Sequence, residues 1–209
     1  MELVRIARGS FATAYLELGG TRVFCVTDHH GHGKEILAHA AERCVSPHLP
    51  RVERWGELPP RGPLRAREVW VMPYYRPLIC EESPAAWAQL NALRKCATDT
   101  DNLLGDDIGA LHNYQTLFYA RVHLSSEPAL LAALEVLVEE AALASEDYVF
   151  EFSPRNVAVD DEGHLVLLDV LYDEAQFGKL ADRDLYRRVG RKRVRSHAVA
   201  SPRRLVLPT

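Results

Sequence analysis

The sequence predicts a mixed α+β fold that begins with a β-rich segment and continues with a mainly helical one. Residues 1–75 consist of short apolar and β-branched runs divided by glycine, proline and polar turns, which is typical of strands. Within them, residues 34–44 instead repeat apolar side chains at helical spacing. Helical spacing dominates from residue 84 onward, until a hairpin follows at residues 156–169. These patterns predict a β-rich part with one helix, followed by a helical part.

Apolar alternation and turn residues predict the strands of the first part, which cover residues 2–7, 12–18, 21–27, 51–58 and 67–75. The polar turn at 8–10 and the pair Gly19–Gly20 separate the first three strands. Pro47 and Pro50 end the helix that precedes them, because proline cannot continue a helical hydrogen-bond ladder. In the second part, helices are expected from Ser83–Pro84, over 106–122 and from Ser126–Pro128.

The composition is that of an ordinary globular protein: of 209 residues, 47% are hydrophobic and 26% are charged. The sequence contains no run of about 18 apolar residues and no signal-peptide pattern, so we expect no membrane span and a cytoplasmic location. The cysteines are widely spaced and form no CxxC pair, which predicts reduced thiols and neither disulfides nor a zinc site; they are Cys25, Cys44, Cys80 and Cys96.

The net charge of −4 hides an uneven distribution. The last segment, residues 183–209, carries nine Arg or Lys side chains and one acidic side chain, Asp184, whereas the rest of the chain carries 16 basic and 28 acidic ones. A basic tail on an acidic body predicts a tail that folds back, binds nucleic acid or binds another acidic partner. A solvated tail is the simpler alternative.

Polar side chains stand at both ends of the predicted hairpin. Asn156 precedes its first strand, and Asp169 directly follows the apolar run 165–168. Amide and carboxylate oxygens are ligands that Mg²⁺ accepts, and Glu151 is placed to take a proton from an attacking hydroxyl. The pattern favours phosphoryl transfer. In the simpler alternative the hairpin only has a polar start and a terminal cap, and Glu151 pairs with an arginine such as Arg155.

The order of these residues resembles the protein-kinase superfamily, whose catalytic loop D-x-x-x-x-N is followed by a hairpin and a metal-binding aspartate. EFSPRN at 151–156 resembles that loop, and IARGSFATAYLEL resembles the glycine-rich loop, with Gly9, Phe11 and Tyr15 in register. VWVMPYY resembles the strand that runs into the hinge, and SPHLPRV resembles the segment after the small-lobe helix. Within the superfamily, residues 4–175 are most similar to the small early serine/threonine kinases of T-odd, podovirus-type bacteriophages.

The resemblance implies a bilobal protein-kinase-like fold with a small β-rich N-lobe (1–75), a reduced, mainly helical C-lobe (76–182) and the basic tail. It implies transfer of the γ-phosphate of ATP, with Mg²⁺, to hydroxyls of host proteins during phage takeover. Asn156 and Asp169 would hold the metal, and Glu151 would orient or deprotonate the acceptor hydroxyl. The residues that it implies in nucleotide binding are Ala7, Arg8, Gly9, Ser10, Phe11, Ala12, Cys25, Met72 and Tyr74.

The sequence departs from the kinase pattern where the family carries charge. Cys25, which fits a small buried side chain, stands in place of the phosphate-binding lysine. Glu151 replaces the catalytic aspartate, and Ser153 replaces a second lysine. Ala7 and Ala12 replace two glycines of the loop. Losing the lysine and altering the base should each lower the rate by orders of magnitude unless another group compensates.

Three cations are candidates to replace the missing lysine, namely Arg8, Lys34 and Arg155, and the sequence does not rank them. Glu35 or Glu42 would be the helix glutamate that pairs with that lysine in the family.

Two other functions stay open. A pseudokinase would keep the scaffold and bind a host factor without transferring phosphate, and the missing lysine favours it. A small-molecule phosphotransferase is the third interpretation, but its large substrate-binding segment is hard to fit into the 40 residues after Asp169. The cluster His29, His30 and His32 could bind a metal ion, although a solvated loop explains it more simply.

Overall fold

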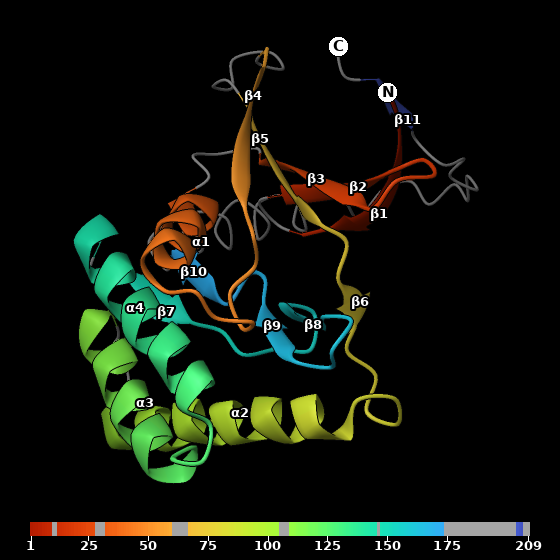
Figure 1. Cartoon of the computed structure of the whole chain (residues 1–209). Helices are drawn as coiled ribbons and strands as arrows, with labels where there is room; N and C mark the ends of the chain where they lie inside the picture. Colours follow the sequence, from red (N-terminus) through yellow and green to blue (C-terminus); the bar gives the residue numbers. More distant parts are fainter. Residues whose placement is uncertain are drawn as a thin grey trace, which may run out of the picture.

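The computed structural model of the chain describes residues 1–9, 12–27, 32–59, 67–104, 109–145, 147–173 and 204–206. These residues have the mixed α+β architecture that the sequence predicts. Their helices are α1 (His32–Arg43), α2 (Pro84–Leu104), α3 (Ala110–His123) and α4 (Pro128–Ala144). In Figure 1 an antiparallel sheet occupies the upper part, α2, α3 and α4 lie below it, and α1 lies between the sheet and α4.

The sheet is antiparallel and consists of β1 (Glu2–Arg8), β2 (Ala12–Glu17), β3 (Arg22–Thr27), β4 (Glu53–Leu58), β5 (Arg67–Pro73) and β11 (Arg204–Val206). The strand order is β11-β1-β2-β3-β5-β4. The first five are the strands predicted from the sequence. β11 comes from the basic tail and was not predicted; it pairs with the edge strand β1, so that Leu205 lies opposite Leu3.

β3 is buried on both faces because α1 covers one side of the sheet and a smaller apolar cluster covers the other. Val23 and Cys25 belong to the main core, together with the apolar face of α1. Phe24 and Val26 point the other way and pack with Leu3. Successive side chains of a strand alternate between faces, so the two sets separate along β3. The prediction that Cys25 is a small buried side chain is therefore confirmed.

Helix α1 is held against both the sheet and α4. Ile36 and Leu37 are buried in the main core, as their helical spacing predicts. At the other end of the helix, the Arg43 guanidinium donates to the carboxylates of Glu139 and Glu140 at 2.6 and 2.5 Å. These two acidic residues belong to α4, so α1 connects the sheet to the helical part.

The three helices of the second part also follow the sequence. α2 begins at Pro84, the predicted first position, and continues to Leu104. α4 begins with Pro128 and buries the predicted apolar stripe, including Leu130, Leu134 and Leu137. α3 begins at Ala110, whereas the prediction started at 106; residues 105–108 lie outside the described part of the chain.

Two small sheets lie between the main sheet and the helices. β6 (Arg76–Pro77), β8 (Val157–Val159) and β9 (Leu165–Leu167) form one, and β7 (Tyr148–Phe150) pairs with β10 (Leu171–Asp173) in the other. The β8–β9 hairpin was predicted, whereas the pair β7–β10 was not. This second pair is antiparallel and sets Phe150 opposite Leu171.

A buried amide joins α3 to β7. Asn113 Nδ2 donates to the carbonyl oxygen of Tyr148 at 2.7 Å, and Asn113 Oδ1 accepts from the backbone N–H of Phe150 at 2.9 Å. One side chain thus satisfies two backbone groups of a strand that has β10 on only one side.

Two predictions on cysteines and membranes can be compared with the structure. All four cysteines are free thiols, as predicted. None of the helices in the described ranges is long and apolar enough to cross a membrane.

Replacing Asn113 with Ala should destabilise the protein by about 2–4 kcal/mol, because it leaves the Tyr148 carbonyl and the Phe150 N–H buried and unpaired. Urea denaturation of the two proteins measures this difference. Asn91→Ala, at an exposed position of α2, is the matched control and should change the free energy of unfolding by less than about 0.5 kcal/mol. Equal effects of the two substitutions would contradict the role assigned to Asn113.

Candidate functional site

The β8–β9 hairpin is a short, buried pair of strands with a polar turn. All six strand residues are buried, and Ala158 lies opposite Val166. Gly163 in the turn has a φ of 91°, a conformation that favours glycine. The Asp160 carboxylate accepts hydrogen bonds from the backbone N–H of His164 at 2.7 Å and from its ring at 2.9 Å. The turn and the burial both hold the hairpin in place.

The open end of this hairpin joins the polar residues that the sequence singled out. The carbonyl oxygen of Asn156 accepts from the backbone N–H groups of Leu168 and Asp169 at 3.0 and 2.9 Å. The Asn156 side chain donates to the carbonyl oxygen of Glu151 at 3.2 Å, and the Glu151 N–H donates to Val170 at 2.7 Å. Glu151, Asn156 and Asp169 are therefore brought together by backbone and amide hydrogen bonds.

A lysine from α1 reaches the same end of the hairpin. The Lys34 ammonium lies 2.9 Å from Asp169 Oδ1 and donates to the carbonyl oxygen of Leu168 at 2.7 Å. Only 7% of the Lys34 side chain is exposed, compared with 56% of the Asp169 side chain. The pair thus has a buried cation on one side and a solvent-accessible carboxylate on the other.

The charges around Lys34 keep it protonated. Burial disfavours the ammonium, but the charge of the Asp169 carboxylate and its hydrogen bond with Lys34 outweigh burial, and the pKa of Lys34 is raised. Burial also raises the pKa of the Cys25 thiol, while Lys34 lowers it less strongly. The thiol on β3 is therefore neutral, and the cation beside Asp169 comes from helix α1.

Lys34 was one of three cations considered as a replacement for the missing lysine, and it alone of the three pairs with Asp169 in the described structure. Arg8 and Arg155 form no ion pair with any described residue. A lysine in the first turn of a helix gives no signal in sequence that it will be buried. The pairing depends on how α1 packs against the hairpin.

The segment from Glu151 to Asn156 carries the Glu151 carboxylate and the Ser153 hydroxyl. The Glu151 side chain is exposed and forms no ion pair within the described residues, so the alternative pairing with Arg155 is not observed. The Ser153 hydroxyl is buried and has no hydrogen-bond partner among the described residues. Leaving a buried hydroxyl without a hydrogen bond costs free energy, so Ser153 Oγ would gain from a partner supplied by a ligand or by a rearrangement of the loop.

The predicted nucleotide-binding loop is only partly described. Ala7, Arg8 and Gly9 end β1, Ala12 begins β2, and the Gly9 N–H donates to the Ala12 carbonyl oxygen at 2.8 Å, while Ser10 and Phe11 lie outside the described residues. A Cβ added at Gly9 would lie 3.7 Å from that oxygen, an ordinary contact, so nothing in the described part of this turn requires a glycine there.

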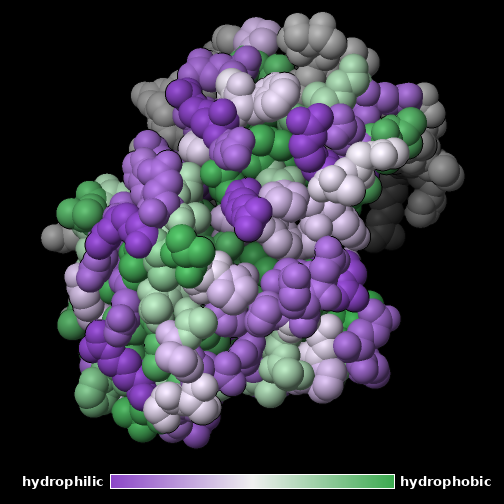
Figure 2. Space-filling model, viewed as in Figure 1, coloured by the Kyte–Doolittle hydropathy of each residue, from purple (hydrophilic) through white to green (hydrophobic). Residues whose placement is uncertain are grey.

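The remaining predicted residues lie in different surroundings. Met72 is buried in the main core, and Tyr74 is 43% exposed. Tyr74 lines a cavity of about 690 Å³ between the segment after α1, the end of β5 and the hairpin turn. This turn is the end of the hairpin opposite to Asn156 and Asp169. Figure 2 shows hydrophilic residues gathered over the hairpin and β6 on this face of the molecule.

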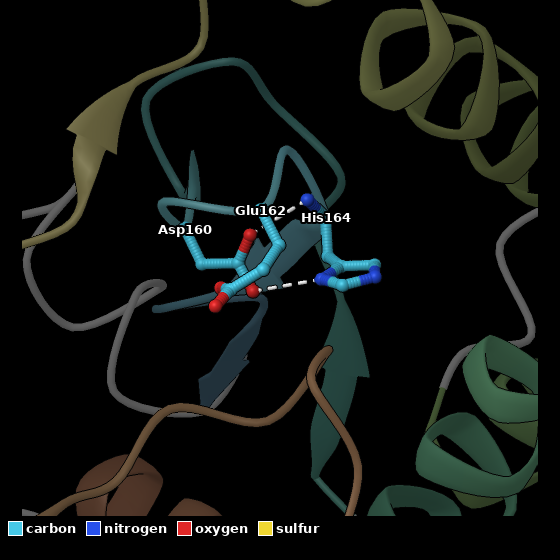
Figure 3. A group of neighbouring side chains, drawn as sticks. All are labelled: Asp160, Glu162 and His164. Carbon is cyan, nitrogen blue, oxygen red and sulfur yellow. Dashed lines mark hydrogen bonds and ion pairs between the residues drawn. The ribbon is translucent and has the colours of Figure 1, made fainter.

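A second polar cluster, which the sequence analysis missed, lines this cavity. Asp160, Glu162 and His164 each place one ligand atom within 4.8 Å of the others (Figure 3). Such a set could hold a divalent ion, but Asp160 and His164 already bind each other as part of the turn. The histidines singled out by the sequence, His29, His30 and the side chain of His32, lie outside the described residues.

Comparisons with known proteins give no family: no protein-family model matches the chain, and no curated protein matches it significantly. The chemistry of the site must therefore be argued from its geometry. Asp169 presents an accessible carboxylate with the Lys34 ammonium beside it, and its backbone is hydrogen-bonded to that of Asn156. A divalent ion together with a phosphate is the kind of ligand that such a set can bind.

Removing Asp169 should lower the free energy of unfolding more than removing Lys34 does. Asp169→Ala leaves a buried ammonium with only the Leu168 carbonyl, which should cost about 2–4 kcal/mol of unfolding free energy. Lys34→Met should cost less than about 1 kcal/mol, because the exposed Asp169 carboxylate can be hydrated and the methionine fills the same space. Urea denaturation gives both values.

The double variant completes this test. Lys34→Met combined with Asp169→Ala should be about as stable as Lys34→Met alone, since no charge is then left buried. Additive losses in the double variant would show that the two side chains do not interact energetically.

Proposed function

We propose that the chain is a divergent, protein-kinase-like phosphotransferase that moves the γ-phosphate of ATP to protein hydroxyls and uses Lys34 in place of the usual strand lysine. The observation that carries the proposal is the Lys34–Asp169 pair beside Asn156. It supplies a fixed cation at the place where the resemblance leads us to expect metal and phosphate, although the lysine of β3 is replaced by Cys25.

The bilobal kinase-like arrangement is part of this proposal. It is supported by the consecutive antiparallel strands β1, β2 and β3, by one helix between β3 and β4, and by a helical part that contains the β8–β9 hairpin. The sheet with α1 would be the N-lobe, and α2, α3 and α4 would form the C-lobe. Lys34 and the hairpin then lie where the two lobes meet.

The proposed chemistry assigns one role to each residue. Asn156 and Asp169 would hold Mg²⁺, which would neutralise the charge of the ATP phosphates. Lys34 has three N–H donors, two of which bind Leu168 and Asp169, and the third donates to a phosphate oxygen. Glu151 accepts the proton of the attacking hydroxyl, or orients it. The substrates we propose are host proteins in the cytoplasm, by the resemblance to phage kinases.

A pseudokinase is the second candidate, and one observation favours it. Lys34 already neutralises Asp169, so a Mg²⁺ ion must compete with a buried ammonium for the same carboxylate. A protein that no longer transfers phosphate would tolerate this competition, and it would use the site to bind a nucleotide or another phosphate without metal.

Binding of ATP should separate these functions. With Mg²⁺, the full chain should bind ATP, and Lys34→Met should weaken that binding by about 10-fold or more through the loss of a buried cation. Isothermal titration calorimetry with and without Mg²⁺ measures the affinity. Lys95→Met, an exposed lysine of α2, should leave it unchanged. If the wild-type chain binds no ATP under either condition, both the kinase and the nucleotide-binding pseudokinase are wrong.

Transfer should then depend on Glu151. Glu151→Gln should retain ATP binding but lower transfer of labelled phosphate to proteins of a bacterial lysate by about 10²-fold or more, because the proton acceptor is lost. Glu82→Gln, at an exposed position just before α2, is the matched control. Binding by the wild type without any transfer would assign the chain to the pseudokinases.

A further inference from the structure

Helix α3 is apolar on its outer face. Leu111, Tyr114, Phe118 and Val122 are 54, 49, 57 and 59% exposed. Their spacing of three or four residues places them on one side of the helix. In Figure 2 hydrophobic residues interrupt the hydrophilic surface over the helical part. Exposed single apolar residues are common, but a row of four large ones along one helix is the pattern of a contact surface.

The inner face of α3 is unusually polar. Its buried residues include His112, Asn113 and Thr116. Asn113 holds β7, and the Thr116 hydroxyl donates to the Thr100 hydroxyl of α2 at 3.1 Å. Leu117 and Ala120 are buried on the same side, so the inner face mixes polar and apolar groups, while large apolar groups lie on the outer face. The contacts of the inner face are sufficient to pack α3 in the fold. The outer row of Leu111, Tyr114, Phe118 and Val122 has no such role, and an intermolecular contact would explain it.

We propose that this row binds the same row of a second copy, with the two α3 helices antiparallel about a twofold axis. The spacing is close to self-complementary when reversed. Leu111 of one copy lies opposite Val122 of the other, and Tyr114 lies opposite Phe118. The two aromatic pairs then occupy the centre of the contact, which is where the residues that dominate binding usually lie.

The charges at the two ends of α3 favour the antiparallel arrangement. Asp101, near the end of α2, lies beside the N-terminal part of α3, where its carboxylate is 2.9 Å from the buried His112 ring, and its side chain is 66% exposed. The last turn carries Arg121 and His123, and Arg121 also pairs with Glu135 of α4. Antiparallel packing opposes the two helix dipoles and brings Asp101 of one copy toward the last turn of α3 in the other. Parallel packing would set like ends together.

The size of the surface predicts a reversible dimer. The 14 residues of α3 span roughly 21 Å. The four half-exposed side chains offer on the order of 400 Å² per copy, or about 800 Å² in the dimer, which is below the roughly 1,000 Å² of most specific interfaces and fits a weak, transient contact. We therefore expect a dissociation constant in the micromolar range.

Sedimentation velocity of the full chain between about 1 and 200 µM tests this surface. The wild type should shift from monomer to dimer over this range, and Phe118→Glu should raise the dissociation constant by about 30-fold or more, because it places a charge in the apolar centre. Leu143→Glu, at a residue of α4 that is 79% exposed, is the matched control and should dimerise as the wild type does. A wild type that remains monomeric at the highest concentration overturns the proposal and leaves the row to another partner. A dimer that Phe118→Glu does not weaken overturns it too.

Mixing two variants tests the antiparallel register. Tyr114→Lys and Phe118→Glu should each dimerise poorly alone, yet an equimolar mixture should form a heterodimer in which the introduced lysine faces the introduced glutamate. The other central pair in that heterodimer is the natural Phe118 with Tyr114. Matching circular dichroism spectra and melting temperatures verify that both variants are folded. A mixture of folded variants that stays monomeric would overturn the proposed register.

Discussion

The arrangement of the site depends on where the buried ammonium of Lys34 finds its partners. A lysine removed from water is stable only beside a carboxylate or carbonyl oxygens, and here these are Asp169 Oδ1 and the Leu168 carbonyl. Because Lys34 begins α1 and Arg43 ends it, the helix is fixed at one end to the hairpin and at the other to α4. The sheet part and the helical part are thereby held in one relative position by charge as well as by apolar packing.

In the proposed kinase-like site, Cys25 on β3 and Lys34 on α1 would take the place of a strand lysine, which changes what the sheet contributes. The thiol of Cys25 is buried and neutral, so β3 contributes shape and packing instead of charge. The positive charge belongs to α1, an element that is fixed by side-chain contacts and not by a hydrogen-bond ladder with neighbouring strands. Its position relative to Asp169 therefore follows the position of α1, which makes the packing of this helix a determinant of any chemistry at the hairpin.

The parts of this structure that were predictable are those specified by local pattern. Alternation along 21–27 and the turn at 160–163 give β3 and the hairpin, and the polar ends of that hairpin give Asn156 and Asp169. The pair β7–β10 has only three residues in each strand, without a connecting turn, so its pairing rests on distant packing. The same holds for Lys34, whose partner is 135 residues away, and for the inner face of α3, whose polar residues resemble a solvent face until Tyr148 and Thr100 are placed beside them.

Asn113 connects helix α3, whose outer face is exposed, to the strand that leads into the loop 151–156. It lies on the inner side of the helix that carries the outer apolar row, and its amide binds both Tyr148 and Phe150, the residue before Glu151. A displacement of α3 along its axis therefore moves the strand that leads into this loop. If association favours one position of α3, a ligand that prefers the same loop geometry will favour association by the same free energy, because linkage between two binding events is reciprocal. If α3 dimerises and the loop binds a ligand, the amide of Asn113 would couple the two binding events.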